Sequence, residues 1–222
     1  MKSSLLITGG LGYVGSFTAK NYLEKTKRKS IVIDNLSRGN NFAKKYSKSK
    51  IIDISNRNIK KIIEKEKIDI ILHLASLTCV RESITNRKRY FTNYKSQIQF
   101  IKNIKKTGVK YFIFSSSLSV FEKNKFKKNL SPYSMYKLKI EKYLKRISSP
   151  NFKVIILRYP NIIGSSPSGK LGEKNNFISR IVPIFYKNII NKKQNILYYD
   201  HKKKVYPYRN YMHVEDIAII NV

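Results

Sequence analysis

The chain is predicted to be an α/β protein, with a Rossmann-type doubly wound parallel sheet followed by a small, apparently truncated C-terminal substrate domain. Short apolar runs alternate with amphipathic stretches, which is typical of parallel strands covered by helices on both faces. Glycines spaced three apart follow the first apolar run directly, and an aspartate ends the second run. We expect residues 1–160 to form the Rossmann domain and residues 161–222 to form part of a substrate-binding region.

The first strand, glycine turn, helix and second strand span residues 4–34. Leu5–Ile7 and Ile31–Ile33 are the apolar strands, and the turn between strand and helix carries Gly9, Gly12 and Gly15. Such a turn needs glycine for its tight bend, for the approach of backbone to a pyrophosphate and for helix–strand packing. The helix that follows offers unpaired N–H groups and the positive end of its dipole to phosphates. The stretch therefore indicates a dinucleotide site, the alternative being a chance glycine-rich turn.

Asp34 ends the second strand, where an acid can accept hydrogen bonds from the adenosine ribose. Its charge would also repel the additional phosphate of NADP. The sequence therefore predicts NAD as the cofactor, and nothing in it indicates a metal.

Charge and cysteine content limit the other functions. The chain has 46 Lys and Arg against 13 Asp and Glu, a net charge of +33. The basic residues are scattered rather than clustered, so we interpret them as compositional bias and expect no specific nucleic acid partner, although a basic nucleic-acid binder is the alternative. One cysteine allows no intrachain disulfide, which favours a reducing cytoplasm. We expect no signal peptide and no membrane segment.

The elements expected between residues 35 and 150 are strands at 51–54, 69–74 and 109–114, helices at 56–67 and 81–107, and a helix opened by residues 131–137. Asp53 lies at the end of the third strand, Ala75 follows the fourth, and Gly108 is expected to cap the long helix. His73 is interpreted as a core histidine. Three serines at 115–117 follow the fifth strand, at the edge where doubly wound folds hold ligands.

Tyr133 and Lys137 are four residues apart and therefore lie on the same face of the predicted helix. A phenol, with a reference pKa of about 10, is a poor base at neutral pH. A nearby ammonium and an oxidised nicotinamide would favour the phenolate. The pair is common by chance, but after a triple-serine strand end and a nucleotide-binding unit it predicts a catalytic base.

These residues resemble the extended short-chain dehydrogenase/reductase family, the NAD-dependent epimerases and dehydratases, and in particular its nucleotide-sugar 4-epimerases. The matching motifs are ITGGLGYVGS, VIDNLSRG, LHLAS, FSSSLSV, SPYSMYK, LRYPNIIGSSPSGKLGE and RNYMHVEDIA. The 4,6-dehydratases of the family place an Asp-Glu pair where this chain has Leu118-Ser119, so the resemblance favours an epimerase.

The resemblance implies an activity: interconversion of UDP-galactose and UDP-glucose by transient oxidation at sugar carbon 4. Tyr133 would take the proton of the 4-hydroxyl, Ser117 would hydrogen-bond the same oxygen, and Lys137 would hold the nicotinamide ribose. The implied substrate residues are Asn161 and Arg209, which would bind the UDP pyrophosphate. The implied cofactor contacts are Gly9, Gly12, Tyr13, Val14, Gly15, Asp34, Asn35, Asp53, Ile54, Ala75, Asn93, Lys137 and Tyr159.

The last third of the chain departs most from the family. We expect a strand at 152–157, a helix at 178–188 bent by Pro183, a short strand at 196–199 and a helix that begins in 211–220. Pro160 and Arg180 stand where the family has Phe and Asn, and the chain is expected to stop before the rest of the substrate domain. Two alternatives follow: an epimerase acting on another NDP-sugar, or a truncated NAD-binding remnant without catalysis. A homodimer through helices 81–107 and 133–147 is also expected.

Overall fold

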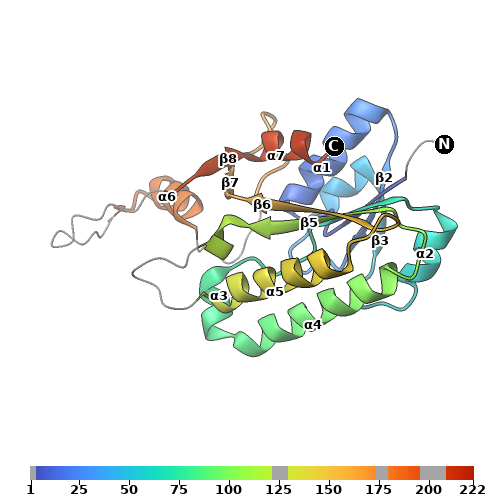
Figure 1. The fold of residues 1–222 in the computed structure, drawn as a ribbon. Helices are drawn as coiled ribbons and strands as arrows, with labels where there is room; N and C mark the ends of the chain where they lie inside the picture. The colour runs from blue at the N-terminus through green and yellow to red at the C-terminus, as the bar shows by residue number, and fades with distance from the viewer. Residues whose placement is uncertain (1–3, 122–129, 174–179, 196–208) are drawn as a thin grey trace.

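The central sheet has six parallel strands in the order β3-β2-β1-β4-β5-β6 (Figure 1). The computed structural model describes residues 4–121, 130–173, 180–195 and 209–222. The six strands are β1 (Leu5–Thr8), β2 (Ser30–Asp34), β3 (Ser47–Ile51), β4 (Ile70–His73), β5 (Tyr111–Ser117) and β6 (Lys153–Tyr159). This order is that of a Rossmann sheet, so the predicted fold class is confirmed.

Helices cover both faces of the sheet (Figure 1). They are α1 (Tyr13–Thr26), α2 (Ile59–Lys65), α3 (Val80–Thr85), α4 (Arg87–Ile104), α5 (Pro132–Ile147), α6 (Ile181–Ile190) and α7 (Val214–Ile220), with 3₁₀ turns η1 (Asn41–Tyr46) and η2 (Leu118–Phe121). Strands β7 (Asn161–Ile163) and β8 (Tyr211–His213) form a separate parallel pair. Figure 1 places α1 and α7 on one side of the sheet and α4 and α5 on the other.

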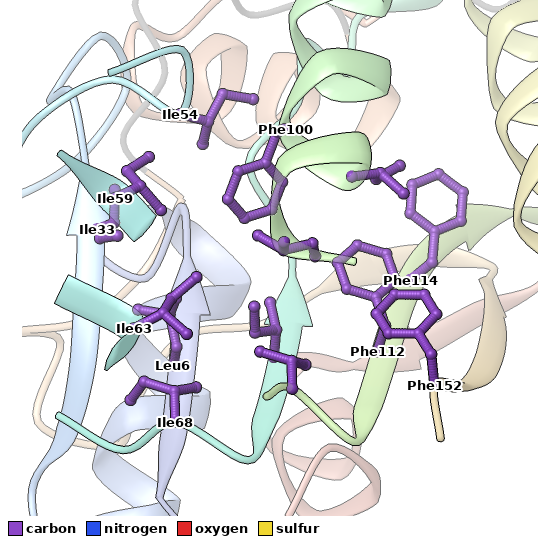
Figure 2. Packing of buried hydrophobic residues seen from close by; sticks show 14 of the residues in the cluster. Leu6, Ile33, Ile54, Ile59, Ile63, Ile68, Phe100, Phe112, Phe114 and Phe152 are labelled. Carbon is purple, nitrogen blue, oxygen red and sulfur yellow. The ribbon is translucent and has the colours of Figure 1, made fainter. Parts of the chain in front are cut away.

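Two apolar clusters form the core, one on each face of the sheet. Leu6 belongs to the cluster under α4 and α5, whereas Leu5 and Ile7 belong to the cluster under α1 and α7. This division follows from the alternation of side chains along a strand. Figure 2 shows Phe100 of α4 lying over the sheet beside Phe112 and Phe114 of β5.

His73 belongs to this aromatic core, as predicted. Its ring stacks 5.0 Å from that of Phe100, and its Nδ1 lies 2.7 Å from Thr8 Oγ1. Burial lowers the pKa of His73 to about 3, so the ring is neutral at physiological pH.

The third strand begins four residues earlier and ends three residues earlier than predicted, at Ser47–Ile51 rather than 51–54. It is the edge of the sheet, where only one side of the strand is paired, and the polar sequence SKSKI is compatible with that partial exposure. The apolar residues that suggested a strand pack into the core from the loop that follows, since Ile54 is buried. Asp53 therefore lies in this loop and not at a strand end.

The long helix predicted at 81–107 is two helices, α3 and α4. The chain breaks at Asn86, whose backbone is not helical (φ −125°, ψ 64°) and whose side chain accepts a hydrogen bond from Arg89 N at 3.2 Å. Asparagine is a favoured N-cap because its side-chain oxygen satisfies an otherwise unpaired N–H. The prediction that Gly108 caps the helix was wrong, since α4 ends at Ile104 and Gly108 does not have a positive φ.

Three smaller differences lie at element ends. Strand β5 continues through the serines to Ser117, because they pair with β6 as far as Tyr159. Residues 211–213 form β8 and precede α7. Pro183 falls in the first turn of α6, where proline removes no intrahelical hydrogen bond. The strand predicted at 196–199 lies outside the described residues.

Candidate active site

A cavity of about 1310 Å³ runs along the carboxyl edge of the sheet. Its walls come from the glycine turn after β1, the ends of β2, β4, β5 and β6, the first turns of α5, and residues 209–210. All the predicted site residues line it: Gly9, Gly12, Tyr13, Val14, Gly15, Asp34, Asn35, Asp53, Ile54, Ala75, Asn93, Ser117, Tyr133, Lys137, Tyr159, Asn161 and Arg209. The fold thus brings together residues that are far apart in the sequence.

The glycine turn leaves no room for side chains. Gly9 has φ +67°, and a Cβ there would lie 2.8 Å from the backbone of Ala75. A Cβ at Gly15 would lie 2.5 Å from Gly10 Cα and closer still to the carbonyl oxygen of Gly9. The glycines therefore let the turn pack backbone to backbone against β4 and the start of α1, with Gly9, Gly12 and Gly15 in the cavity wall. This is the cradle that a pyrophosphate requires, so these residues fit a dinucleotide.

Asp34 is buried at the end of β2 and holds the glycine turn. Its Oδ2 accepts a hydrogen bond from Leu11 N at 3.0 Å, and its Oδ1 accepts one from Leu36 N at 2.8 Å. Burial raises the pKa of Asp34 above its ordinary value, although the backbone N–H donors oppose the shift. The carboxylate therefore orients the turn in addition to facing the cavity.

Asn35 and Asp53 form a second polar pair beside Asp34. Asn35 Nδ2 donates to Asp53 Oδ2 at 2.7 Å, and the other carboxylate oxygen accepts from Ser55 N at 2.9 Å. Burial pushes the pKa of Asp53 upward, but the hydrogen bonds from Ser55 and Asn35 outweigh it and lower the pKa overall.

Asn93 faces the cavity from α4 with a defined amide orientation. Its Oδ1 accepts hydrogen bonds from Gln97 Nε2 at 2.8 Å and from Leu77 N at 3.3 Å. The carbonyl oxygen is thus occupied by protein donors, and the amide nitrogen is the group that can serve a ligand.

Tyr133 and Lys137 lie on one face of α5, as predicted, because the helix begins at Pro132 with Ser131 as its N-cap. The Nζ of Lys137 is 6.0 Å from the centre of the Tyr133 ring and donates a hydrogen bond to Ser115 O at 2.7 Å. Ser117 lies nearby at the end of β5, and its Oγ accepts from Ser119 N at 3.2 Å. The phenol, the amine and the hydroxyl are therefore gathered in the same cavity.

The charge of Lys137 depends on pH in a way that the sequence did not indicate. The side chain is only 4% exposed, and burial lowers the pKa of Lys137 to about 7, while Glu141 opposes this shift. The amine therefore loses its proton far more readily than that of an exposed lysine.

Glu141, one turn after Lys137, is the centre of a buried polar network. Its Oε1 accepts from Ser116 Oγ at 2.5 Å and from Arg158 Nε at 3.0 Å, while its Oε2 accepts from Arg158 Nη2 at 2.6 Å. This network joins β5, β6 and α5 one helical turn from Lys137.

The remaining predicted residues lie on β6 and on the segments that follow it, and Tyr159 is the strand partner of Ser117. Tyr159 is among the lining residues, its side chain packs against the apolar cluster under α1 and α7, and its hydroxyl donates to Asn221 Oδ1 at 2.5 Å. Asn161 Nδ2 donates to Asn210 O at 3.2 Å, which places Asn161 next to Arg209, an exposed cation at the cavity wall. The prediction that these two residues act together is compatible with this arrangement.

Two ion-pair groups at the cavity were missed by sequence reasoning. Glu82 pairs with Arg38 and Arg89, and Glu173 pairs with Arg180. The sequence did offer one indication of these ion pairs. Acidic residues are scarce in this chain, so an acidic residue within a basic stretch has a high chance of forming an ion pair. Within the described residues, no cluster of His, Cys, Asp or Glu could hold a metal ion, and no helix is long and apolar enough to cross a membrane.

A Rossmann sheet with a glycine cradle, an acid at the end of β2 and a Tyr–Lys pair at its carboxyl edge defines a dinucleotide-binding enzyme fold of the short-chain dehydrogenase/reductase type. The sequence profile of the NAD dependent epimerase/dehydratase family matches residues 5–222, and the chain belongs to this family. The resemblance predicted from the motifs is therefore confirmed.

Individual relatives point the same way. The chain is 33% identical to a UDP-glucose 4-epimerase of Yersinia enterocolitica, over 97% of this chain and 71% of the relative. The structure of UDP-glucose 4-epimerase from Brucella ovis in complex with NAD superimposes with a TM-score of 0.88 at 25% identity, over 99% of this chain and 72% of that one. The structure of the UDP-Glc/GlcNAc 4-epimerase of Campylobacter jejuni superimposes with a TM-score of 0.80 at 29% identity, over 99% of this chain and 73% of that one.

Proposed function

We propose that this protein interconverts UDP-galactose and UDP-glucose with NAD as a permanently bound cofactor. The observation that carries the proposal is the meeting, in one cavity, of the glycine cradle with Tyr133, Lys137 and Ser117. The relatives named as UDP-glucose 4-epimerases support it.

The binding roles follow from the walls of the cavity. The backbone of the glycine turn and the N-terminus of α1 would hold the pyrophosphate of NAD, and Asp34 the adenosine ribose. The amide nitrogen of Asn93 and the ring of Tyr159 would complete the cofactor contacts. After β6, Arg209 with Asn161 would bind the UDP pyrophosphate, for which arginine offers charge-assisted hydrogen bonds.

The chemistry rests on the groups at the end of β5 and the start of α5. NAD would supply a hydride acceptor that returns the hydride later in the same turnover. Tyr133 takes the proton of the sugar 4-hydroxyl as the C–H bond at carbon 4 breaks, and returns it after the 4-ketose has presented its other face. Ser117 hydrogen-bonds the same oxygen, and Lys137 holds the nicotinamide ribose and stabilises the phenolate when it is protonated.

A second sugar nucleotide is also a candidate substrate. The Campylobacter jejuni relative is named for both UDP-Glc and UDP-GlcNAc, so an N-acetylated sugar nucleotide is the second candidate. Parallel assays with UDP-galactose and UDP-GlcNAc at equal concentrations distinguish the two candidates by their kcat/KM values.

The test of the activity is the formation of UDP-glucose from UDP-galactose by the purified protein supplied with NAD. Tyr133→Phe should remove activity while leaving urea unfolding unchanged. Tyr136→Phe is the matched control, since this tyrosine of the same helix stacks on Tyr94 with ring centres 4.9 Å apart. Absence of UDP-glucose formation in the wild type would contradict the proposal, and binding of NAD without any UDP-sugar would instead indicate a non-catalytic NAD-binding protein.

Organisation and assembly belong to the same proposal. Strands β7 and β8 pair only with each other among the described residues, which supports a boundary near residue 160 between the Rossmann domain and the substrate region, although α7 packs back on α1 in the Rossmann core. A homodimer through α4 and α5 would cover the half-exposed ring of Phe91 on α4, and sedimentation tests it. We propose a cytoplasmic location because the single cysteine allows no intrachain disulfide, as expected in a reducing compartment.

A further inference from the structure

Glu82 of α3 binds two arginines at once beside the cavity. Its Oε2 accepts from Arg38 Nη2 at 2.5 Å, and its Oε1 accepts from Arg89 Nη1 at 2.5 Å. Arg38 belongs to the loop after β2 and Arg89 to the first turn of α4, so one carboxylate joins three separate segments. Both carboxylate oxygens are therefore committed to guanidinium groups.

The position of Glu82 is itself well defined. Its backbone N–H donates to Cys79 Sγ at 3.4 Å, and Tyr90, which is buried, donates to Glu82 Oε2 at 3.1 Å. The Tyr90 hydroxyl also accepts from the backbone N–H of Cys79 at 3.0 Å, and it shares its single proton between Glu82 and the carbonyl oxygen of Cys79, which lies 2.7 Å away. The side chain of Glu82 is 14% exposed, against 24% for Arg38. Burial alone would raise the pKa of Glu82, but the bonds from the arginines lower it, so the carboxylate is charged at neutral pH.

The two arginines line the cavity wall, whereas Glu82 stands behind them and does not. The backbone that carries Arg38 passes close to Asp34, because a Cβ on the next residue, Gly39, would lie 3.0 Å from Asp34 Oδ1. Arg38 thus belongs to the loop that runs beside the carboxylate expected to receive the ribose hydroxyls, while its guanidinium is bound to Glu82.

This placement matters for the choice between the two nicotinamide dinucleotides. An acid at the end of the second strand suits the 2′-hydroxyl of NAD, whereas an arginine nearby accommodates the 2′-phosphate of NADP. The guanidinium fork matches phosphate well, so Arg38, on the loop after Asp34 and in the cavity wall, has the chemistry that NADP requires. In the sequence, Asp34 is the only residue that indicates a preference for NAD. The sequence does not show what keeps Arg38 from binding the 2′-phosphate of NADP.

We propose that Glu82 is a specificity-determining residue that excludes NADP by holding Arg38, and with it Arg89, in an ion pair away from the 2′ position of the adenosine ribose. This inference rests on the proposed function only in assuming that the cavity binds a nicotinamide dinucleotide. Glu82 contacts neither cofactor and acts through the arginines.

The test compares the dissociation constants of NAD and NADP for Glu82→Gln and for the wild type, by titration calorimetry at fixed ionic strength. Release of Arg38 should raise the affinity for NADP relative to NAD about tenfold or more, the effect of one gained charge-assisted hydrogen bond. The matched control is Glu64→Gln on α2, which removes the same charge from an exposed pair with Lys60 and should leave the ratio unchanged. The double variant Arg38→Met/Glu82→Gln should lose most of the gain.

An equal change of both affinities in Glu82→Gln, or a gain that persists in the double variant, would overturn the inference. If Glu82→Gln does not fold, the single variant Arg38→Met tests the inference instead. Its NADP affinity should equal that of the wild type, because an arginine already held by Glu82 contributes nothing to NADP binding. A loss of NADP affinity in Arg38→Met would then refute the inference. A wild-type protein that binds neither dinucleotide would refute the proposed function as well, whereas binding of NAD with an unmoved ratio refutes the inference alone.

Discussion

Replacement of Gly15 by alanine tests whether the bare backbone of the glycine turn holds the cofactor. The added Cβ would meet backbone atoms of Gly9 and Gly10, and it would lie 2.5 Å from Gly10 Cα. Backbone atoms cannot rotate away from such a clash as a side chain could. Gly15 lies in the first turn of α1, where alanine gains up to about 1 kcal/mol in helix propensity. Overpacking against fixed neighbours costs roughly 1–3 kcal/mol, so the clash outweighs the gain.

The expected results for Gly15→Ala are a free energy of unfolding lower by about 1–2 kcal/mol and an NAD affinity reduced by more than about tenfold, because the turn must move away from the pyrophosphate. Urea unfolding and calorimetric titration with NAD measure the two effects. Gly108→Ala is the matched control, since nothing lies within 4 Å of its added Cβ and its φ is not positive, and it should preserve both quantities. Wild-type NAD affinity in Gly15→Ala would refute the assignment of this turn as the pyrophosphate site.

Two further predictions concern the buried groups of α5. The pKa of Lys137 is about 7 in the folded protein against an ordinary value of 10.5, so between these values the unfolded chain binds more protons. The free energy of unfolding of the wild type, measured relative to that of Lys137→Met, should therefore rise as the pH is raised from 7 towards 10. The expected slope is up to about 1.4 kcal/mol per pH unit, and parallel pH profiles of the two proteins would contradict the prediction. Glu141→Gln should destabilise the fold by roughly 1–3 kcal/mol in urea unfolding, less than for a fully buried pair because Arg158 is 29% exposed. The exposed Lys60–Glu64 pair provides the control, where Glu64→Gln should cost under about 0.5 kcal/mol, and equal losses in the two variants would refute the structural role of Glu141.

The sequence alone predicted most strands and the helices that follow them, because short apolar runs and helical periodicity report burial directly. The predictions were wrong where a polar segment forms a strand, or where an apolar residue is buried without belonging to a strand or helix. At the edge strand Ser47–Ile51 a polar run is paired, while the apolar Ile54 is buried from a loop. At Asn86 a single side chain that can cap a helix divides a periodic stretch into α3 and α4, and periodicity does not register such a break.

The glycine spacing, Asp34 and the Tyr133–Lys137 spacing were determined by the sequence itself, since each depends on local geometry within one turn, one strand end or one helix. Only the tertiary structure decided the charge of Lys137, which depends on how deeply α5 buries it against β5. The same holds for Arg38, Glu82 and Arg89, whose ion pairs join segments that no local pattern relates. The physical reason is that desolvation and long-range ion pairing arise only when distant segments have packed together.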